Sequence, residues 1–212
     1  MRSLAGFDLD GTLLRKNSSF AFIRFLAKKG FFSKQELLLC YGYYLSHRFS
    51  NLPLLNLHEK VLKSLFRGKT IDDLQTFLQI FIDEELKNMW YHPALHRFHL
   101  LKQTGAHLML LSNSPTFLVQ PIAATLGVDR AFGTEYALDA NGSFSAIALL
   151  LDGRKKAELL QKEAKELEIV ETCAFSDSLL DLPFLESAKT AIAVKPHRAL
   201  KRIAKQCRWE IL

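Results

Sequence analysis

Hydrophobic and polar positions follow two different patterns along this chain. Four short runs are rich in apolar residues: 4–9, 106–111, 169–176 and 190–194. Such runs, bounded by polar residues or glycine, are typical of buried strands. From about Arg15 to Arg97 the apolar residues instead recur at helical spacing, as at Leu74, Leu78 and Phe81. The pattern therefore predicts strands at both ends of the chain and a helical block after the first strand.

Two start signals support helices inside this block. Ser33 precedes Glu36 as in a capping box, and Thr70 is followed by Asp72 and Asp73, as at the entry of a helix. The block is also rich in aromatic residues. These favour packing between small helices, although contact with a membrane or a ligand stays open.

The block is too long to be a simple connection. We therefore expect an all-helical cap inserted over residues 15–97 and a core formed by residues 1–14 and 98–212. After residue 105 strands and helices alternate, and Asn141 with Gly142 predicts a β-hairpin turn. The fold class that follows is α/β: a Rossmann-like three-layer core with a central parallel sheet, covered at one end by the cap.

Composition adds a charge preference and few exclusions. The 212 residues are 49% hydrophobic and 24% charged, with a net charge of +6, as in an ordinary folded protein with acidic partners such as phosphorylated molecules, nucleic acid or anionic membranes. Cys40, Cys173 and Cys207 lack metal or redox spacing, which favours a reducing cytoplasm. We expect no cleavable signal peptide, because this sequence starts directly with a predicted strand. We expect no transmembrane segment, because no apolar run approaches roughly 20 residues.

The first strand ends in two carboxylates with the same orientation. Asp8 and Asp10 are two residues apart, so their side chains point the same way and repel each other unless a positive charge lies between them. Ligands that are all oxygen suit Mg²⁺ or Ca²⁺ better than zinc. Gly11 allows a tight turn and can present its N–H to an anion. The alternative is a solvated strand end followed by ordinary turn residues.

A serine follows the next predicted strand. Ser112 stands in a strand-to-helix turn, where a hydroxyl and free backbone N–H groups can bind a phosphate. Ser114 as N-cap and Pro115 as the first helical residue predict a helix that runs to about Leu126. Simple turn chemistry remains an equal explanation for Ser112.

Later in the chain, a lysine and two further aspartates are candidates for the same edge of the sheet. The apolar stripe through Leu160 continues back to Lys156, whereas Lys155 lies on a mostly polar face with Glu163. Lys156 is therefore the better candidate for facing a site. Asp177 ends a predicted strand and Asp181 follows in a first helical turn, where it can also serve the helix dipole.

The order and chemistry of these motifs resemble the haloacid dehalogenase superfamily of phosphatases. The resemblance rests on Asp-x-Asp-Gly-Thr-Leu from residue 8, the apolar strand ending in Ser112, the lysine at position 156, and Ser-Asp-Ser with Asp-Leu-Pro from residue 176. It covers nearly the whole chain. The long insertion is similar to that of the phosphoserine-phosphatase-like branch, in which a helical cap separates the first two motifs.

The resemblance implies roles for the acidic residues. Asp8 would be the nucleophile that forms an aspartyl-phosphate, and Asp10 would be the general acid and base. Mg²⁺ would be the cofactor, held by Asp8, the backbone carbonyl of Asp10, and Asp177. Asp181 would steady Lys156 or a metal-bound water.

The resemblance also implies a phosphate-binding set. Ser112 and Lys156 would hold the phosphoryl oxygens, together with backbone N–H groups near Leu9, Gly11 and Asn113. The cap would exclude water and select the substrate.

One departure bears on the substrate. Phosphoserine phosphatases carry a glutamate after the first motif that binds the substrate's amino group, and by spacing Asn17 stands there. We expect a Mg²⁺-dependent phosphatase for a small cytoplasmic phosphomonoester other than phosphoserine. The alternatives are a phosphatase for a lipid-like phosphomonoester at a membrane surface and a non-catalytic module that binds a phosphorylated ligand. Nucleic acid is not an expected partner, and the oligomeric state stays open.

Overall fold

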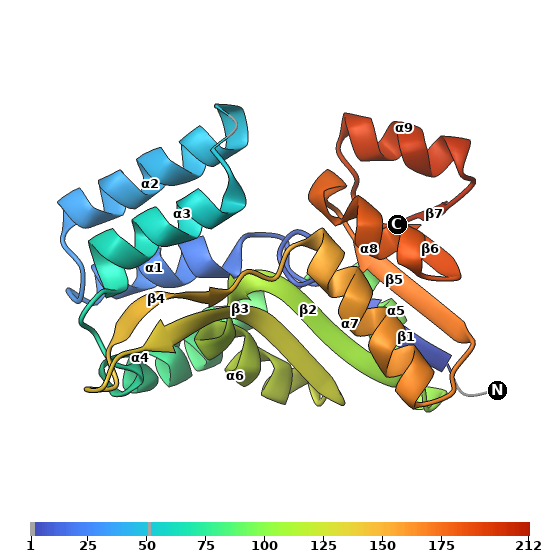
Figure 1. Ribbon diagram of the computed structural model, residues 1–212, viewed down its shortest axis with the longest axis horizontal. Coiled ribbons are helices and arrows are strands. Elements are labelled where there is room, and N and C mark those ends of the chain that lie inside the picture. The colour runs from blue at the N-terminus through green and yellow to red at the C-terminus, as the bar shows by residue number, and fades with distance from the viewer. Residues whose placement is uncertain (1–2, 51) are drawn as a thin grey trace.

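The structure, a computed structural model, describes residues 3–50 and 52–212 (Figure 1). In this part of the chain seven strands form one sheet in the order β4-β3-β2-β1-β5-β6-β7. The strands are β1 (Ser3–Phe7), β2 (His107–Pro115), β3 (Arg130–Leu138), β4 (Phe144–Leu149), β5 (Glu171–Ser176), β6 (Thr190–Ala193) and β7 (Glu210–Ile211). Neighbouring strands are parallel except for β3 and β4, which form the predicted hairpin. The predicted α/β class with a central parallel sheet is confirmed, and the β3–β4 hairpin makes the sheet mostly parallel.

Helices cover both faces of this sheet. The helices of the described residues are α1 (Ser18–Lys28), α2 (Lys34–Phe49), α3 (Leu54–Val61), α4 (Ile71–Glu84), α5 (His92–Gln103), α6 (Thr116–Leu126), α7 (Gly153–Glu166), α8 (Leu182–Ser187) and α9 (Arg198–Gln206), with a π-helical segment η1 (Leu62–Phe66) and the short 3-10 helices η2 (Leu86–Asn88) and η3 (Leu179–Asp181). Successive residues of β2 alternate between two apolar clusters. Leu108 and Leu110 pack in one cluster with α5 and α6, whereas Met109 and Leu111 pack in the other with α7, α8 and α9. Period-2 alternation thus builds the three layers.

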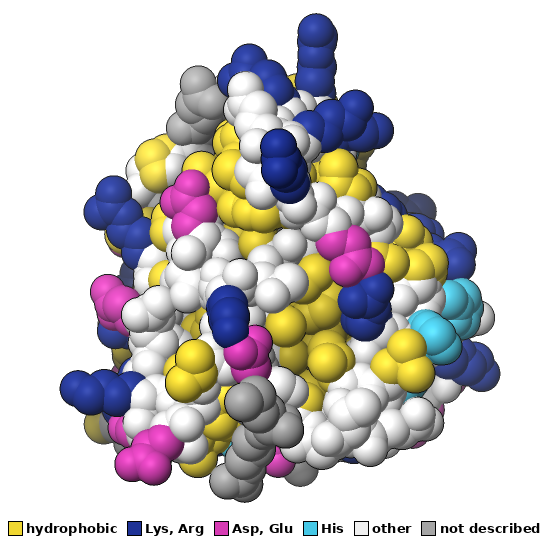
Figure 2. Space-filling view, turned by 90° about the vertical axis from the view of Figure 1, so that its right-hand side faces the viewer, with side chains coloured by type: hydrophobic (Ala, Val, Ile, Leu, Met, Phe, Trp, Pro, Cys, Tyr) yellow, Lys and Arg dark blue, Asp and Glu magenta, His cyan; other side chains and the backbone are white. Residues whose placement is uncertain are grey.

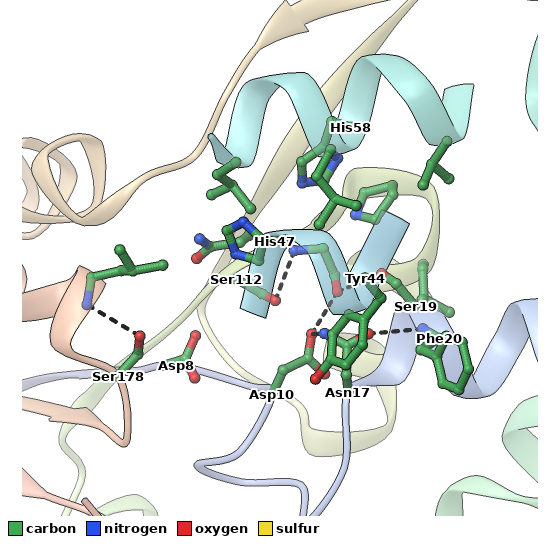
Figure 3. Close-up of a pocket in the computed structure, with 18 of the residues that line it drawn as sticks. Asp8, Asp10, Asn17, Ser19, Phe20, Tyr44, His47, His58, Ser112 and Ser178 are labelled. Carbon is green, nitrogen blue, oxygen red and sulfur yellow. Dashed lines mark hydrogen bonds between the residues drawn. The ribbon is translucent and has the colours of Figure 1, made fainter. Parts of the chain in front are cut away.

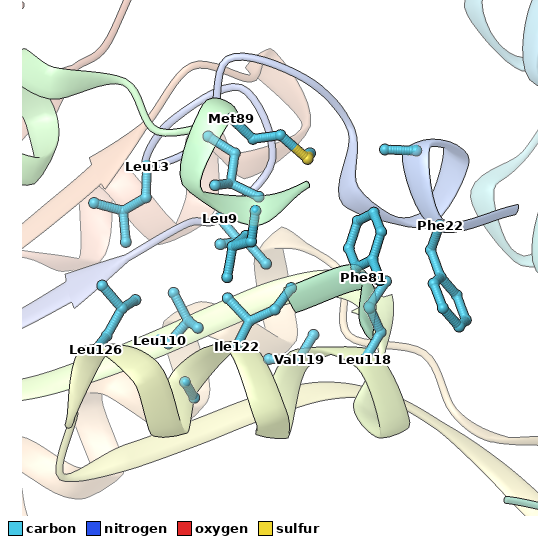
Figure 4. Close-up of a cluster of buried hydrophobic side chains, with 14 of the residues drawn as sticks. Leu9, Leu13, Phe22, Phe81, Met89, Leu110, Leu118, Val119, Ile122 and Leu126 are labelled. Atoms are coloured by element: carbon cyan, nitrogen blue, oxygen red, sulfur yellow. The ribbon is translucent and has the colours of Figure 1, made fainter. Parts of the chain in front are cut away.

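The helical insertion lies between β1 and β2 in the chain. The predicted capping box of Ser33 with Glu36 is present at α2, and the predicted helix entry at Thr70 is also a capping box, with Asp73, at α4. The insertion shares the hydrophobic cluster of the first face, as Figure 4 shows for Phe81 of α4 beside Leu118 of α6. The insertion is therefore packed onto the sheet layers rather than built around a core of its own.

Two boundaries expected from the sequence differ from those in the structure. The expected cap boundary after residue 97 falls inside α5, and α5 buries Ala94 and Phe98 against the sheet. The expected start of the next helix at Pro115 is wrong, because β2 continues through Pro115 to pair with Thr134 of β3, and α6 begins at Thr116.

The carboxyl-terminal helix α9 separates apolar and basic residues. It buries Leu200 and Ala204 against the sheet, and its basic side chains are exposed at the top of Figure 2. No helix among the described residues combines the length and the apolar character that a membrane span requires.

Candidate active site

The polar ends of β1, β2 and β5 meet at one edge of the sheet, where ligands bind in open α/β folds. A cavity of about 730 Å³ opens there between the sheet and the helical insertion (Figure 3). Its lining includes most of the residues singled out from the sequence: Asp8, Asp10, Ser112, Asn113, Asp177 and Asp181. Lys156, Leu9 and Gly11 are not part of this lining, and the side chain of Leu9 is buried in the hydrophobic core.

A buried chain of charges runs through the base of the site. The ammonium group of Lys156 donates hydrogen bonds to Oδ1 of Asp8 at 2.7 Å and to Oδ2 of Asp181 at 2.8 Å. Ser176 donates a third bond, from Oγ to Oδ2 of Asp181, at 2.7 Å. Lys156 reaches this position because α7 begins at Gly153, where a Cβ would lie 2.2 Å from the carbonyl oxygen of Leu180. Any other residue at position 153 would push the helix, and Lys156 with it, away from the site.

Burial and the charges of neighbouring groups shift the pKa values of Lys156 and Asp8 in opposing directions. Burial by itself lowers the pKa of Lys156, but the charges of Asp181 and Asp8 outweigh it, so the pKa lies above its ordinary value and the lysine stays charged. Burial raises the pKa of Asp8 well above its ordinary value; Lys156 lowers it, whereas Asp181 and Asp177 raise it further. One lysine therefore does not neutralise the acidic groups around it.

Asp10 has a different environment from Asp8. Its Oδ1 accepts a hydrogen bond from the backbone N–H of Ser18 at 2.6 Å, and its Oδ2 accepts from Oγ of Ser114 at 2.6 Å and from Nδ2 of Asn17 at 3.3 Å. Burial raises the pKa of Asp10, and the bonds from Ser114 and Ser18 oppose that rise. Ser114 was expected to cap a helix, but its hydroxyl is used here instead, which explains the misplaced helix start.

Asn17 stands where the resemblance would place a glutamate that binds the substrate, and here it has a structural role. Its Oδ1 accepts from the N–H of Phe20 at 2.8 Å and so caps α1, while its Nδ2 donates to Asp10. The start of the insertion is thereby tied to the carboxylate of the first motif. Sequence reasoning did not predict that Ser114 binds Asp10. The two residues are far apart in the chain, so no short motif contains both of them.

Asp177 lies directly against the turn after β1. Its backbone N–H donates to Oγ1 of the buried Thr12 at 3.0 Å. Gly11 has a φ of +89°, and a Cβ at this residue would lie 2.2 Å from Oδ2 of Asp177. Burial raises the pKa of Asp177 to about 6, and the charge of Asp181 adds to the rise. Glycine is thus required at position 11 both by the turn and by the carboxylate packed on it.

Ser112 and Asn113 lie at the end of β2, next to these carboxylates. Ser112 is fully buried, and its Oγ accepts from the N–H of Ser114 at 3.1 Å. The carbonyl of Asn113 accepts from Oγ1 of Thr134 at 2.7 Å, which fixes this last part of the strand. Ser112 was expected in a strand-to-helix turn, but both residues lie within β2, where its register shifts, and they border the cavity. A phosphate can be bound there by hydroxyl and backbone donors.

The donor set suits a magnesium ion. Among the described residues no group of three or more His, Cys, Asp or Glu side chains has a geometry that could hold a metal by itself. Mg²⁺ does not need one, because it binds through one or two carboxylates together with water and phosphate oxygens. Asp8 and Asp177 are two such carboxylates; burial raises the pKa of each, and the charge of Asp181 raises both further. The residues therefore fit the ion.

Sequence reasoning missed the polar residues that the insertion brings to the cavity. His47 and His58 lie above the aspartates in Figure 3. Nδ1 of His58 lies 3.0 Å from the hydroxyl of Tyr136, and Nδ1 of His47 lies 2.6 Å from the carbonyl of Leu52. No local motif marks these histidines, so only the packing of the insertion onto the core could identify them.

Comparisons with known proteins find similar phosphatases and a similar fold. The phosphoserine phosphatase SerB1 of Mycobacterium tuberculosis is 26% identical over 221 residues, covering 100% of this chain and 70% of that protein. The histidinol-phosphatase of Neisseria meningitidis is 24% identical and covers 100% of this chain and 99% of that protein. A crystal structure of a protein of unknown function from Bordetella pertussis shares the fold, with a TM-score of 0.89, 24% identity, and coverage of 100% of this chain and 98% of that chain.

The sequence profile of the haloacid dehalogenase-like hydrolases matches residues 5–186, which is most of the chain. The match confirms the resemblance and the expectation of an enzyme of the phosphatase type. The chain belongs to the haloacid dehalogenase-like hydrolase family.

Proposed function

We propose that this protein is a Mg²⁺-dependent phosphomonoester phosphatase that acts through an aspartyl-phosphate on Asp8. The observation that carries the proposal is the pair of neighbouring carboxylates in unlike environments. Asp8 is bonded to a charged lysine, whereas Asp10 is bonded to a hydroxyl, an amide and a backbone N–H. Two carboxylates with different surroundings are suited to different roles, one as nucleophile and one as acid and base.

Each residue then has a defined task. Lys156 occupies Oδ1 of Asp8, which leaves Oδ2 to attack phosphorus while the leaving oxygen departs on the opposite side. Asp10 gives its proton to that leaving oxygen, and then takes one from the water that hydrolyses the aspartyl-phosphate. A bound Mg²⁺, held by Asp8, Asp177 and the backbone carbonyl of Asp10, would supply positive charge between the carboxylate and the phosphoryl group.

The remaining residues of the site bind and support. Ser112 and Lys156, with backbone N–H groups at Leu9, Gly11 and Asn113, hold the phosphoryl oxygens. Asp181 keeps Lys156 in place through its 2.8 Å hydrogen bond. The insertion over the site excludes water during the reaction.

The substrate that we propose is a phosphomonoester other than phosphoserine. Asn17 caps α1 and binds Asp10, so it offers no carboxylate to a substrate amine. We place the protein in the cytoplasm, in keeping with three cysteines that are all free thiols, and we expect no nucleic-acid partner.

Hydrolysis of p-nitrophenyl phosphate tests the proposal. We expect turnover with Mg²⁺, none with chelator, and a loss of at least about a thousandfold in Asp8→Asn, because the nucleophile is removed. Acid quenching should trap a phosphorylated Asp8 in the wild-type protein. Asp72→Asn, at an exposed position on α4, is the matched control and should retain full activity. Full turnover by a folded Asp8→Asn variant would overturn the mechanism.

A further inference from the structure

The cavity continues from the aspartates into a mostly apolar chamber below the insertion. Apolar side chains from α1, α3, η1 and α6 form its walls: Phe20, Leu57, Val61, Phe66, Phe117 and Leu118. The whole cavity, about 730 Å³, lies within the range of roughly 300–1,000 Å³ that holds drug-sized ligands. A phosphate with only a few attached atoms would leave much of this apolar surface in contact with water.

Two histidines on the chamber walls are already bonded within the protein. Nδ1 of His58 is bonded to Tyr136, and Nδ1 of His47 is bonded to the carbonyl of Leu52. Burial lowers the pKa of His58 to about 4, so its imidazole is neutral near pH 7. Nδ1 of each histidine and the hydroxyl of Tyr136 therefore have a partner without a ligand.

Among the described residues that line the cavity, the acidic side chains are the aspartates of the catalytic end, and none is a lysine, an arginine or a glutamate. A substrate carboxylate placed in the chamber would therefore lose its hydration without gaining an ion pair, which is costly. The chamber consequently favours an uncharged group.

The rim opposite the insertion is apolar as well. Leu179 and Leu180 of η3 border the cavity, and they are 46% and 56% exposed. These exposed leucines add apolar surface beside the catalytic end of the cavity.

We propose that the substrate's phosphate is attached to an elongated, uncharged apolar group that lies in this chamber against α1, α3 and η1. The inference rests on the proposed function and narrows it to one substrate class, phosphomonoesters of alkyl, isoprenoid or aryl chains. The same chemistry is available from a free amphiphile and from a lipid in a membrane, and the experiment separates these sources.

The test is a series of monoalkyl phosphates from ethyl to decyl, used as monomers with Mg²⁺, with release of inorganic phosphate as the readout. We expect kcat/KM to rise by up to about fourfold for each added methylene, since burial of one CH₂ contributes about 0.8 kcal/mol. Phosphoserine and histidinol phosphate should be poorer substrates than octyl phosphate. A kcat/KM that does not change with chain length, or a preference for phosphoserine, would overturn the inference.

A chamber-filling variant locates the effect. Val61→Trp should lower the ratio of kcat/KM for octyl phosphate to that for ethyl phosphate by at least about tenfold, because the indole occupies the space of the chain. Leu38→Trp is the matched control, since Leu38 is 71% exposed on α2 and does not line the cavity, and its ratio should equal that of the wild type. An unchanged ratio in a folded Val61→Trp variant would show that the chain binds elsewhere and would contradict the inference.

The outcomes separate this inference from the proposed function. Turnover of p-nitrophenyl phosphate and ethyl phosphate with no gain for longer chains removes the inference and leaves the phosphatase. No turnover of any phosphomonoester by the folded Mg²⁺-loaded protein removes both. A final arm presents phosphatidic acid in phosphatidylcholine vesicles. Cleavage there supports a membrane lipid as the source of the chain, whereas cleavage of the monomeric alkyl phosphates alone supports a free amphiphile.

Discussion

Replacing Asp177 with asparagine should stabilise the metal-free protein while it removes activity. Burial raises the pKa of Asp177 from 3.8 to about 6, and the charge of Asp181 adds to the rise. When the folded pKa of an acid lies above the unfolded one, folding favours the protonated form. The associated stability is present at low pH and is lost as the pH rises through the folded pKa. Asparagine cannot ionise, so the variant avoids this loss.

The size of the effect follows from the shift. The pKa rises by about two units, and one unit corresponds to about 1.36 kcal/mol, so the upper limit near pH 7 is about 3 kcal/mol. Because Asp177 is only partly buried, relaxation and contact with water reduce the effect, and we expect about 1–3 kcal/mol. Linkage leaves about half of the gain near pH 5.

Urea unfolding in the presence of chelator, repeated at several values between about pH 5 and 8, measures this difference. Asp83→Asn, at an exposed position on α4, is the control and should show no comparable pH dependence. Added Mg²⁺ should stabilise the wild type and not Asp177→Asn, because ligand binding to the folded state adds to its stability. A difference between wild type and variant that does not change with pH would refute the reasoning, since the stabilisation would then not come from the ionised carboxylate.

Three further substitutions test the geometry of the site. Lys156→Met should cost about 3–5 kcal/mol of unfolding free energy, because it leaves Asp8 and Asp181 buried without their cation; the control Lys155→Met should stay within about 0.5 kcal/mol by urea unfolding. Gly11→Ala should abolish phosphatase activity and weaken Mg²⁺ binding measured by calorimetry, since the added Cβ collides with Asp177. The control is Gly142→Ala, which is also at positive φ but has open space around it, and this variant should lose stability alone. Ser114→Ala should lower kcat by about tenfold and move the pH profile upward, because a hydrogen bond that lowers the pKa of Asp10 is lost; Ser114→Thr should restore both, and an unchanged profile would contradict a positioning role.

In the helical insertion, local sequence signals predict where helices begin, whereas tertiary packing decides which side chains meet. The capping box of α2 forms where Ser33 and Glu36 predict it, and α4 begins after Thr70 as predicted, since a helix cap depends only on residues three apart. The cavity walls could not be predicted in this way. Phe66 and Phe117 come together only when η1 packs over α6, and no sequence spacing encodes that contact.

Two polar residues were misjudged for the same reason. Ser114 has the local signature of a helix cap, but its hydroxyl donates to the carboxylate of Asp10 instead of capping the helix. Glu163 was assigned to a polar face of α7, yet it is only 8% exposed, with Oε1 2.9 Å from Nε2 of His107 and Oε2 3.8 Å from Nε of Arg130. Both partners come from strands distant in the chain.

The sequence by itself determined the alternation of strands and helices, the turn at Gly11, and the identity of the acidic, serine and lysine candidates. These depend on periods of two and 3.6 residues and on short-range turn chemistry, which are local properties. Only the tertiary structure decided that Lys156 lies between Asp8 and Asp181, 148 and 25 residues away in the chain. It also decided that an apolar chamber adjoins them. The position of Lys156 and the shape of the chamber both follow from the packing of side chains that are distant in sequence. The same packing buries the charged groups and so shifts their pKa values.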